Sequence, residues 1–183
     1  ISRNMKNYQR LLQNYRSAYL QLAVVYYMEY QKMKRNKNNR LEENLNSLKK
    51  KIIIVLDKVE QILLVDIIPI QSEDLHYQIA RIYGDLDEIE SMENILEKLI
   101  DNENGKPLNR VEYANTFYRE LNSTARAIGI LEDLRQNYMK KERMVMSKGF
   151  SNKTVRKGEW NRWEKAYPEI ISSLVFIYRE NNQ

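Results

Sequence analysis

The stretch Tyr83–Leu99 reads YGDLDEIESMENILEKL, and 35 residues later Tyr118–Leu134 reads YRELNSTARAIGILEDL. The two copies align without a gap and share residues at six positions: Tyr83, Leu86, Ile95, Leu96, Glu97 and Leu99 return as Tyr118, Leu121, Ile130, Leu131, Glu132 and Leu134. A fixed period of about 34 residues, carried on helical apolar spacing, is typical of stacked helix pairs. The chain is therefore expected to be built from repeated pairs of helices.

The composition favours an all-helical fold. Of 183 residues, 43% are hydrophobic and 30% are charged, which suits one domain or a short repeat array with a sizeable core. Only 5 Gly and 3 Pro interrupt the chain, and strands bounded by Gly or Pro turns are hard to find. The absence of Cys excludes disulfides, thiolate metal sites and a cysteine nucleophile.

The apolar spacing predicts a single helical-repeat domain over residues 1–183. The expected parts are helix pairs at about 5–66, 72–101 and 109–139, a basic connector at 140–159, and a capping helix within 160–180. Ser72 is the expected N-cap of the second pair, and Pro168 suits the first position of the last helix.

In the first predicted helix, apolar residues recur in steps of three and four. These residues, expected on the buried face, are Leu11, Tyr15, Tyr19, Leu22 and Tyr26. No apolar run approaches the roughly 20 residues that a membrane helix needs; the longest are Ile52–Leu56 and Ile62–Val65. Because the chain opens on Ile1 rather than Met, we expect it to be a piece of a longer protein.

Residues 75–100 resemble a tetratricopeptide repeat. A small residue, Ala80, is followed by Tyr83 and Leu86, an acidic turn, and a second helix that would pack through Met92, Leu96 and Leu99. The usual Trp of the family is replaced by His76, and its turn Gly by Asp87. The resemblance implies antiparallel helix pairs stacked as a short α-solenoid with a C-terminal capping helix, a fold that binds proteins or peptides.

A second resemblance covers residues 11–27, LLQNYRSAYLQLAVVYY, and residues 68–85, IPIQSEDLHYQIARIYGD. Both look like the soluble C-terminal tails of bacterial multi-pass membrane proteins of the protein O-mannosyltransferase-like type. This implies a membrane-associated protein with the present chain on the extracytoplasmic side, a cytoplasmic location being the alternative. The glycosyltransferase-like body would lie outside this sequence, so no catalytic residue is carried onto it.

A ligand groove is the site that the tetratricopeptide resemblance implies. In such arrays the first helix of each pair lines the groove, offset from the face that packs. The corresponding positions here are Tyr27, Tyr77, Arg81, Asp85, Glu112, Thr116 and Arg119. The alternative is that these side chains form an ordinary solvated face.

Residues that could support catalysis are few. His76 is the only His, which excludes a multi-His metal site and leaves one imidazole for acid-base work. It replaces the packing Trp of a repeat helix, so a buried structural role is favoured. The five Gly are scattered and form no phosphate-binding loop. The sequence predicts no catalytic residue, no metal and no cofactor, and hence no enzyme activity for this chain.

Positive charge is concentrated in two segments. Gln31–Arg40 holds five basic residues and no acid, and Lys140–Glu159 holds seven basic residues against two acids. The basic surface is predicted at Lys34, Arg35, Lys37, Arg40, Lys153, Arg156 and Lys157. These could contact nucleic-acid phosphates, with Trp160 and Trp163 stacking on bases, or lie against anionic lipid headgroups. A solvated connector is the default for either segment.

The sequence therefore favours a non-catalytic domain that binds or scaffolds a protein or peptide partner, as the soluble tail of a membrane-anchored glycosyltransferase-like protein. The alternative is a module that binds nucleic acid or an anionic membrane surface through its basic loops, and of these nucleic acid is less favoured because the helical body is acidic. The sequence leaves the partner and the oligomeric state open.

Overall fold

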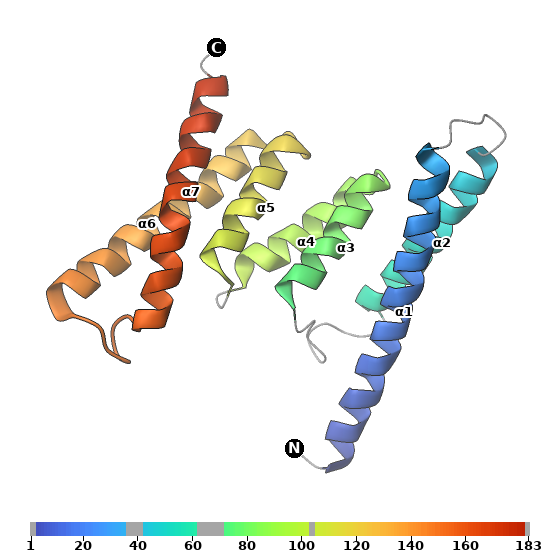
Figure 1. The fold of residues 1–183 in the computed structure, drawn as a ribbon, viewed down its shortest axis with the longest axis horizontal. Helices are drawn as coiled ribbons and strands as arrows, with labels where there is room; N and C mark the ends of the chain where they lie inside the picture. Colours follow the sequence, from blue (N-terminus) through green and yellow to red (C-terminus); the bar gives the residue numbers. More distant parts are fainter. Residues whose placement is uncertain (1–2, 36–41, 62–71, 103–104, 182–183) are drawn as a thin grey trace. The chain divides into compact units, whose positions relative to one another are not determined.

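In a computed structural model of the chain, the residues that can be described are 3–35, 42–61, 72–102 and 105–181. They form seven α-helices and no strand, only one isolated bridge between Phe150 and Val155 (Figure 1). This confirms the prediction of an all-α fold for the described part of the chain. The helices divide into two compact units, residues 1–88 and residues 89–183, and each is described by itself.

Unit 1 contains α1 (Arg3–Arg35), α2 (Glu42–Gln61) and α3 (Glu73–Asp85). Helix α2 packs against α1 and lies beside its C-terminal part (Figure 1). Helix α2 buries an apolar stripe at helical spacing, made of Leu48, Ile52, Val55, Leu56 and Val59. Ala23 of α1 is fully buried, and its small side chain allows the close approach of a neighbouring element.

The buried face of α1 differs from the one predicted. The buried residues are Arg16, Leu20, Ala23 and Tyr30. Three residues expected on the buried face, Leu11, Tyr15 and Leu22, are 50%, 56% and 39% exposed. Adjacent residues of an α-helix are about 100° apart around its axis. In α1 both the predicted stripe and the observed buried stripe carry apolar side chains. Spacing alone therefore could not choose between them.

The two sequence copies share their turn geometry. Asp87 has φ 60° and Asn122, 35 residues later, has φ 51°, so both copies place a left-handed residue after the first helix. Asp and Asn tolerate this conformation better than most residues other than Gly. Asp87 therefore adopts a backbone conformation that Gly favours, at the position where the tetratricopeptide resemblance expects a Gly. The start of α3 is also as predicted, since the Leu75 amide donates to Ser72 Oγ at 3.3 Å.

Unit 2 contains α4 (Ile89–Asp101), α5 (Pro107–Arg119), α6 (Thr124–Lys148) and α7 (Lys157–Asn181). Helices α5, α6 and α7 pack against one another, and α4 contacts α5 (Figure 1). Within the four helices of the unit, buried apolar side chains recur at the predicted helical spacing. They are Met92, Ile95, Leu96, Leu99, Val111, Tyr113, Ala114, Phe117, Ala127, Ile130, Leu131, Leu134, Trp160, Trp163, Ala166, Ile170, Leu174 and Ile177.

The ends of α6 and α7 differ from the sequence-based expectation. Helix α6 continues to Lys148 and α7 begins at Lys157, so much of the expected connector 140–159 is helical. Gly149, at φ 66°, follows the last residue of α6 and ends it. Pro168 lies inside α7 rather than at its start. Pro168 and Glu164 are both exposed, so the carbonyl that loses its partner amide lies on the hydrated side of the helix.

Candidate functional site

In unit 1, three polar side chains predicted for the groove meet between α1 and α3. The Tyr27 hydroxyl donates to Asp85 Oδ2 and accepts from Gln31 Nε2 at 2.8 Å. Burial raises the pKa of Tyr27 to about 12, with the bond to Asp85 as the next contribution, while the charge of Arg81 acts in the opposite direction. Tyr27, Arg81 and Asp85 are thus close enough to interact. However, the tyrosine and the carboxylate already bind each other, which leaves less of their hydrogen-bonding capacity for a ligand.

Deeper in unit 1, buried polar groups join different helices. Tyr83 donates to Asp57 Oδ1 at 2.8 Å, and His76 Nε2 lies 3.1 Å from Glu60 Oε1. Tyr83 is 2% exposed and His76 is 6% exposed. Burial, followed by the bond to Asp57, raises the pKa of Tyr83 far above its ordinary value. These contacts hold α2 to α3, which agrees with the structural role expected for His76.

In unit 2, the three predicted groove residues have different environments. Glu112 is exposed, whereas Thr116 is 4% exposed and donates its hydroxyl to the Glu112 carbonyl at 3.0 Å. Thr116 therefore does not face a ligand at the surface. Arg119 is exposed at the end of α5, with its Cζ 5.9 Å from the centroid of the Phe176 ring of α7. Of the three, Arg119 has the position and the chemistry of a recognition residue.

Around Arg119, aromatic and apolar side chains of α5 and α7 reach the surface. Tyr118 meets Phe176 edge to face at a centroid distance of 6.1 Å. Phe176 is 45% exposed, and its neighbours Val175 and Tyr178 are each 42% exposed. We call Tyr118, Arg119, Val175 and Phe176 the Arg119 patch. Its α7 half is absent from the predicted site residues, although residues 174–178, LVFIY, are apolar around the whole helix and cannot all be buried on one face.

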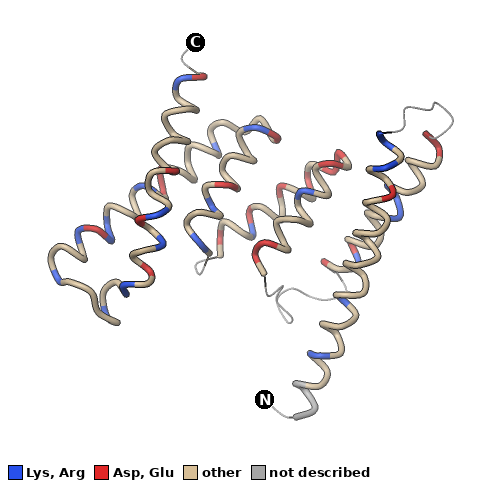
Figure 2. The backbone as a smooth tube through the Cα atoms, viewed as in Figure 1, with Lys and Arg blue, Asp and Glu red and all other residues tan. Residues whose placement is uncertain are grey.

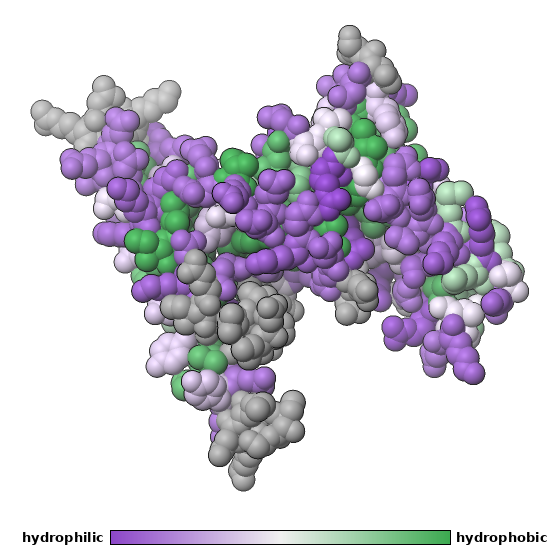
Figure 3. Space-filling model, turned by 180° about the vertical axis from the view of Figure 1, so that it is seen from behind, coloured by the Kyte–Doolittle hydropathy of each residue, from purple (hydrophilic) through white to green (hydrophobic). Residues whose placement is uncertain are grey.

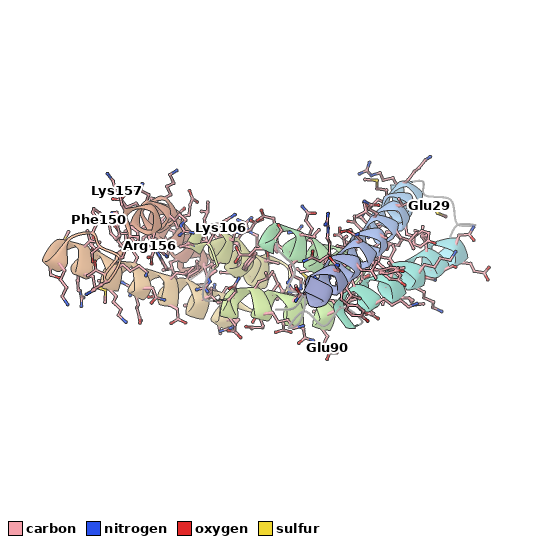
Figure 4. All side chains as sticks on the ribbon, turned by 90° about the horizontal axis from the view of Figure 1, so that it is seen from below. Glu29, Glu90, Lys106, Phe150, Arg156 and Lys157 are labelled. Carbon is pink, nitrogen blue, oxygen red and sulfur yellow. The ribbon has the colours of Figure 1, made fainter. Side chains whose placement is uncertain are left out.

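The second candidate surface of unit 2, which we call the basic tip, is residues 140–159. It comprises the last turns of α6, the loop 149–156 and the first turn of α7. Several Lys and Arg positions are gathered along the backbone at this end (Figure 2), and Phe150, Arg156 and Lys157 lie close to one another there (Figure 4). The exposed basic residues are Lys140, Arg143, Lys148, Lys153, Arg156 and Lys157. The basic tip thus contains the predicted basic residues Lys153, Arg156 and Lys157. It also contains exposed cations of α6 that the prediction did not include.

The two acids of the basic tip are already engaged. Lys141 Nζ contacts Glu159 Oε1 at 2.5 Å, and the Tyr138 hydroxyl lies 3.5 Å from Glu142 Oε1. The bond from Lys141 is the main reason why the pKa of Glu159 is lowered. Glu159 therefore stays ionised at neutral pH and offsets chiefly Lys141. The other cations of the tip retain their excess positive charge.

The loop of the basic tip is held by its own hydrogen bonds. The Ser151 amide donates to the Val155 carbonyl at 3.2 Å, and Thr154 Oγ1 donates to the Gly149 carbonyl at 3.0 Å. Ser151 Oγ and Thr154 Oγ1 are 2.8 Å apart. Val155 is 1% exposed and anchors the loop, whereas Phe150 is 48% exposed. The loop thus fixes an aromatic side chain in an outward position beside the cations.

The proposed role of the two tryptophans in stacking on bases is not supported by their positions. Trp160 and Trp163 are each 8% exposed. Tyr138 stacks between Trp160, at a centroid distance of 5.2 Å, and Tyr167, at 4.0 Å. The ring faces that a base would need are therefore covered by protein. Apolar periodicity in α7 could have indicated this, because Trp160, Trp163, Ala166 and Ile170 share one face.

The first basic segment lies at the end of α1. Lys34 and Arg35 are exposed, and Lys34 Nζ lies 5.6 Å from the centroid of the Tyr30 ring. Lys37 and Arg40 fall outside the described residues. Among the residues that are described, no group of three His, Asp or Glu side chains is placed to hold a metal ion. None of the described helices combines the length and the apolar character needed to cross a membrane.

Comparisons with known proteins give no match: no protein-family model, curated protein or solved structure is significantly similar to this chain.

Proposed function

We propose that this chain is a non-catalytic interaction domain that binds a protein or peptide through the Arg119 patch. The observation that carries the proposal is the placement of Arg119 over Phe176, which is itself 45% exposed, with Val175 exposed at the adjacent position of α7. Arginine and large aromatic residues are the side chains that most often dominate binding energy at protein interfaces. The two ends of the patch come from α5 and α7, which pack together in one unit.

The outer face of α7 strengthens this proposal. A terminal helix of a helical array needs a polar outer surface to remain soluble. Helix α7 instead exposes Val175, Phe176 and Tyr178, each by more than two fifths of its surface. A partner that covered this face would remove apolar surface from water, which is the main driving force of association. Binding of the partner would thereby cover the exposed apolar face of α7.

The chemistry of the patch defines the partner. The guanidinium of Arg119 already lies beside an aromatic ring, and its planar fork can bind a carboxylate with two hydrogen bonds. Phe176 and Val175 offer apolar contacts next to it. We therefore expect a peptide in which an acidic residue is followed or preceded by a large apolar one. An amphipathic helix with this pair on one face would meet both requirements.

The wider setting rests on the two sequence resemblances. We propose that the helix pairs stack as a short tetratricopeptide-like solenoid, closed by α7, and the shared turn geometry at Asp87 and Asn122 supports this. We also propose that the domain is the tail of a membrane-anchored glycosyltransferase-like protein, on its extracytoplasmic side. Membrane spans encoded upstream of Ile1 in the gene would support that parentage.

Peptide selection tests the proposed function. A library of displayed peptides is selected on the immobilised chain, and the affinities of the recovered peptides are measured by calorimetry. Replacing Arg119 or Phe176 by Ala should weaken binding at least about tenfold, since truncating a dominant interface residue costs about 2 kcal/mol or more. Leu108→Ala is the matched control, because Leu108 is an exposed apolar residue of the same unit and is absent from the patch.

Two results would contradict the proposal. One is a selection that gives no binder, or binders whose affinity is the same for Arg119→Ala, Phe176→Ala and the control. The other is self-association of the chain that is abolished by Phe176→Ala in light scattering, since the patch would then bind a second copy. Arg81→Ala should leave peptide binding unchanged, and weaker binding by this variant would contradict a site confined to unit 2.

A further inference from the structure

We propose that the basic tip docks on an anionic lipid bilayer, with the cations at the headgroups and Phe150 inserted between them. This inference is independent of the peptide-binding proposal, because it concerns other residues. The basic tip includes the first turn of α7, whereas the Arg119 patch lies near the C-terminal end of the same helix. At 1.5 Å per residue, Lys157 and Phe176 are about 28 Å apart along that helix, so one surface can be occupied while the other is free.

The arrangement of charge fits a flat anionic surface. Three elements that are joined at one end of unit 2 each contribute exposed cations: Arg143 and Lys148 from α6, Lys153 from the loop, and Lys157 from α7. Figure 4 shows Phe150, Arg156 and Lys157 at the same end. A polybasic segment is attracted to anionic lipid in proportion to the number of Lys and Arg residues near the surface. The tip therefore supplies several such charges at once.

Exposed apolar side chains lie among these cations. Phe150 is 48% exposed, Met146 is 80% exposed and Met144 is 36% exposed. In the space-filling view, pale green hydrophobic surface interrupts the hydrophilic surface at this end of unit 2 (Figure 3). Side chains of this kind gain free energy when they enter the boundary between headgroups and acyl chains. Attraction between the cations and anionic headgroups does not depend on exposed apolar side chains, whereas insertion into the bilayer does.

The loop is suited to insertion because it is already ordered. Its internal bonds between Ser151, Thr154 and Val155 satisfy backbone groups that would otherwise need water. The buried Val155 fixes the loop to the unit, while Phe150 stays exposed. Docking therefore requires little ordering of the chain, which lowers its entropic cost.

The exposed side chains favour a bilayer over single-stranded nucleic acid. Nucleic-acid grooves combine cations with aromatic rings whose faces are open to stack on bases. Here Trp160 and Trp163 are buried, and Tyr138 is stacked between Trp160 and Tyr167. The accessible apolar groups include the thioethers of Met144 and Met146, which suit an acyl boundary better than a base.

Co-sedimentation with lipid vesicles tests the charge component. The full chain should bind vesicles that contain phosphatidylserine and phosphatidylcholine, and should not bind phosphatidylcholine alone. Lys153→Gln, Arg156→Gln and Lys157→Gln together should lower partitioning about 100-fold, since each cation near an anionic surface contributes about fivefold. The matched control neutralises Arg10, Lys50 and Lys58, three exposed cations of unit 1, and should leave partitioning unchanged.

Two further variants test the insertion component. Phe150→Ser should lower partitioning about tenfold, because one large apolar side chain no longer leaves water. Leu108→Ser is its control, since Leu108 is also 48% exposed. The chain has no Cys, so one can be introduced for an environment-sensitive dye. The dye at Asn152→Cys should report an apolar environment on vesicle binding, and the dye at Glu90→Cys, an exposed position of α4, should not.

Several results would overturn the inference. Equal binding to neutral and anionic vesicles would remove the charge component. Unchanged partitioning of Phe150→Ser, or a dye at residue 152 that stays in water, would remove the insertion component. Preferential binding of a single-stranded oligonucleotide, with loss on Lys153→Gln, Arg156→Gln and Lys157→Gln, would assign the tip to nucleic acid. Peptide binding at the Arg119 patch should be the same in all these variants, so failure of one proposal leaves the other intact.

Discussion

In unit 1, polar side chains of different helices bind one another beside an apolar core, whereas in unit 2 aromatic rings stack on one another beside an apolar core. The buried tyrosine of unit 1, Tyr83, donates to Asp57, and His76 meets Glu60. In unit 2, Phe117 is fully buried, and the half-buried ring of Tyr138 stacks beside Trp160. The same helical period therefore supports two kinds of core.

This difference has a functional meaning. Polar groups that are bonded to each other inside a unit fix its helices but offer little to a ligand. Unit 2 leaves Arg119 over an exposed ring at one end of α7 and the basic tip at the other. We therefore place both interaction surfaces in unit 2.

The largest expected effect comes from the apolar core of unit 2. Phe117→Ala should lower the free energy of unfolding by about 3–5 kcal/mol, because it removes a fully buried ring and leaves a cavity. Denaturant unfolding followed by tryptophan fluorescence measures this, since both Trp residues, Trp160 and Trp163, belong to unit 2.

The matched control is the same change at an exposed ring of the same unit. Phe176→Ala should cost at most about 1 kcal/mol, which is the usual value of its edge contact with Tyr118. An equal loss for the two variants would show that Phe176 is a packing residue, and would weaken the Arg119 patch as a binding surface.

The helical fold could be predicted because buried positions recur at the helical period. Ile95, Leu96 and Leu99, and their counterparts Ile130, Leu131 and Leu134, are all buried, as the sequence repeat indicated. The buried stripe of α1 could not be chosen, because Tyr and Leu residues stand on both sides of it. The sixth helix is longer than predicted, because the basic residues after Met139 indicate a connector by charge but continue the helix in the structure. Lys, Arg, Glu and Met are all strong helix formers, and Gly149 was the better stop signal.

The candidate sites were predicted only in part. Arg119 and the cations Lys153, Arg156 and Lys157 were identified because charge and repeat register can be read along the chain. Their partners could not be, because Phe176 and Phe150 reach these surfaces through tertiary packing and loop geometry. Stacking of Trp160 on a base was a reasonable hypothesis from composition. It failed because burial depends on which face of α7 meets α6.

The polar core of unit 1 should give the next largest effect. Tyr83→Phe removes a hydrogen bond to a carboxylate, and such bonds contribute about 1.5–3 kcal/mol to stability. Asp57 Oδ1 would lose this hydrogen-bond donor. We expect a loss of about 2 kcal/mol in the unfolding free energy measured by far-ultraviolet circular dichroism.

A double-mutant cycle tests the origin of this loss. The losses in unfolding free energy caused by Asp57→Asn and by Tyr83→Phe are measured separately. Their sum should exceed the loss in the double variant, because the two side chains bind each other. Additive costs would show that the buried tyrosine stabilises unit 1 through packing only. In that case the cores of the two units would be alike, and the contrast drawn above would lose its basis.

The smallest effect is expected at the edge of unit 1 and depends on pH. Burial and the bond to Asp85 raise the pKa of Tyr27 to about 12 from a model-compound value of 10.0. Below pH 10 the folded and unfolded chains both hold this proton. Between these two pKa values the unfolded chain loses the proton first, so the stability contributed by Tyr27 is complete below that window and declines through it as pH rises.

Tyr27→Phe should remove that pH dependence. At neutral pH the variant should cost less than about 1 kcal/mol, since the bond lies near the surface. The difference in unfolding free energy between wild type and variant should then fall towards zero as the pH rises above 10. Tyr15→Phe, at a tyrosine that is 56% exposed, is the control and should follow the wild type at every pH. A constant difference across the alkaline range would mean that Tyr27 is free to ionise, and that Tyr27 and Asp85 remain available to a ligand after all.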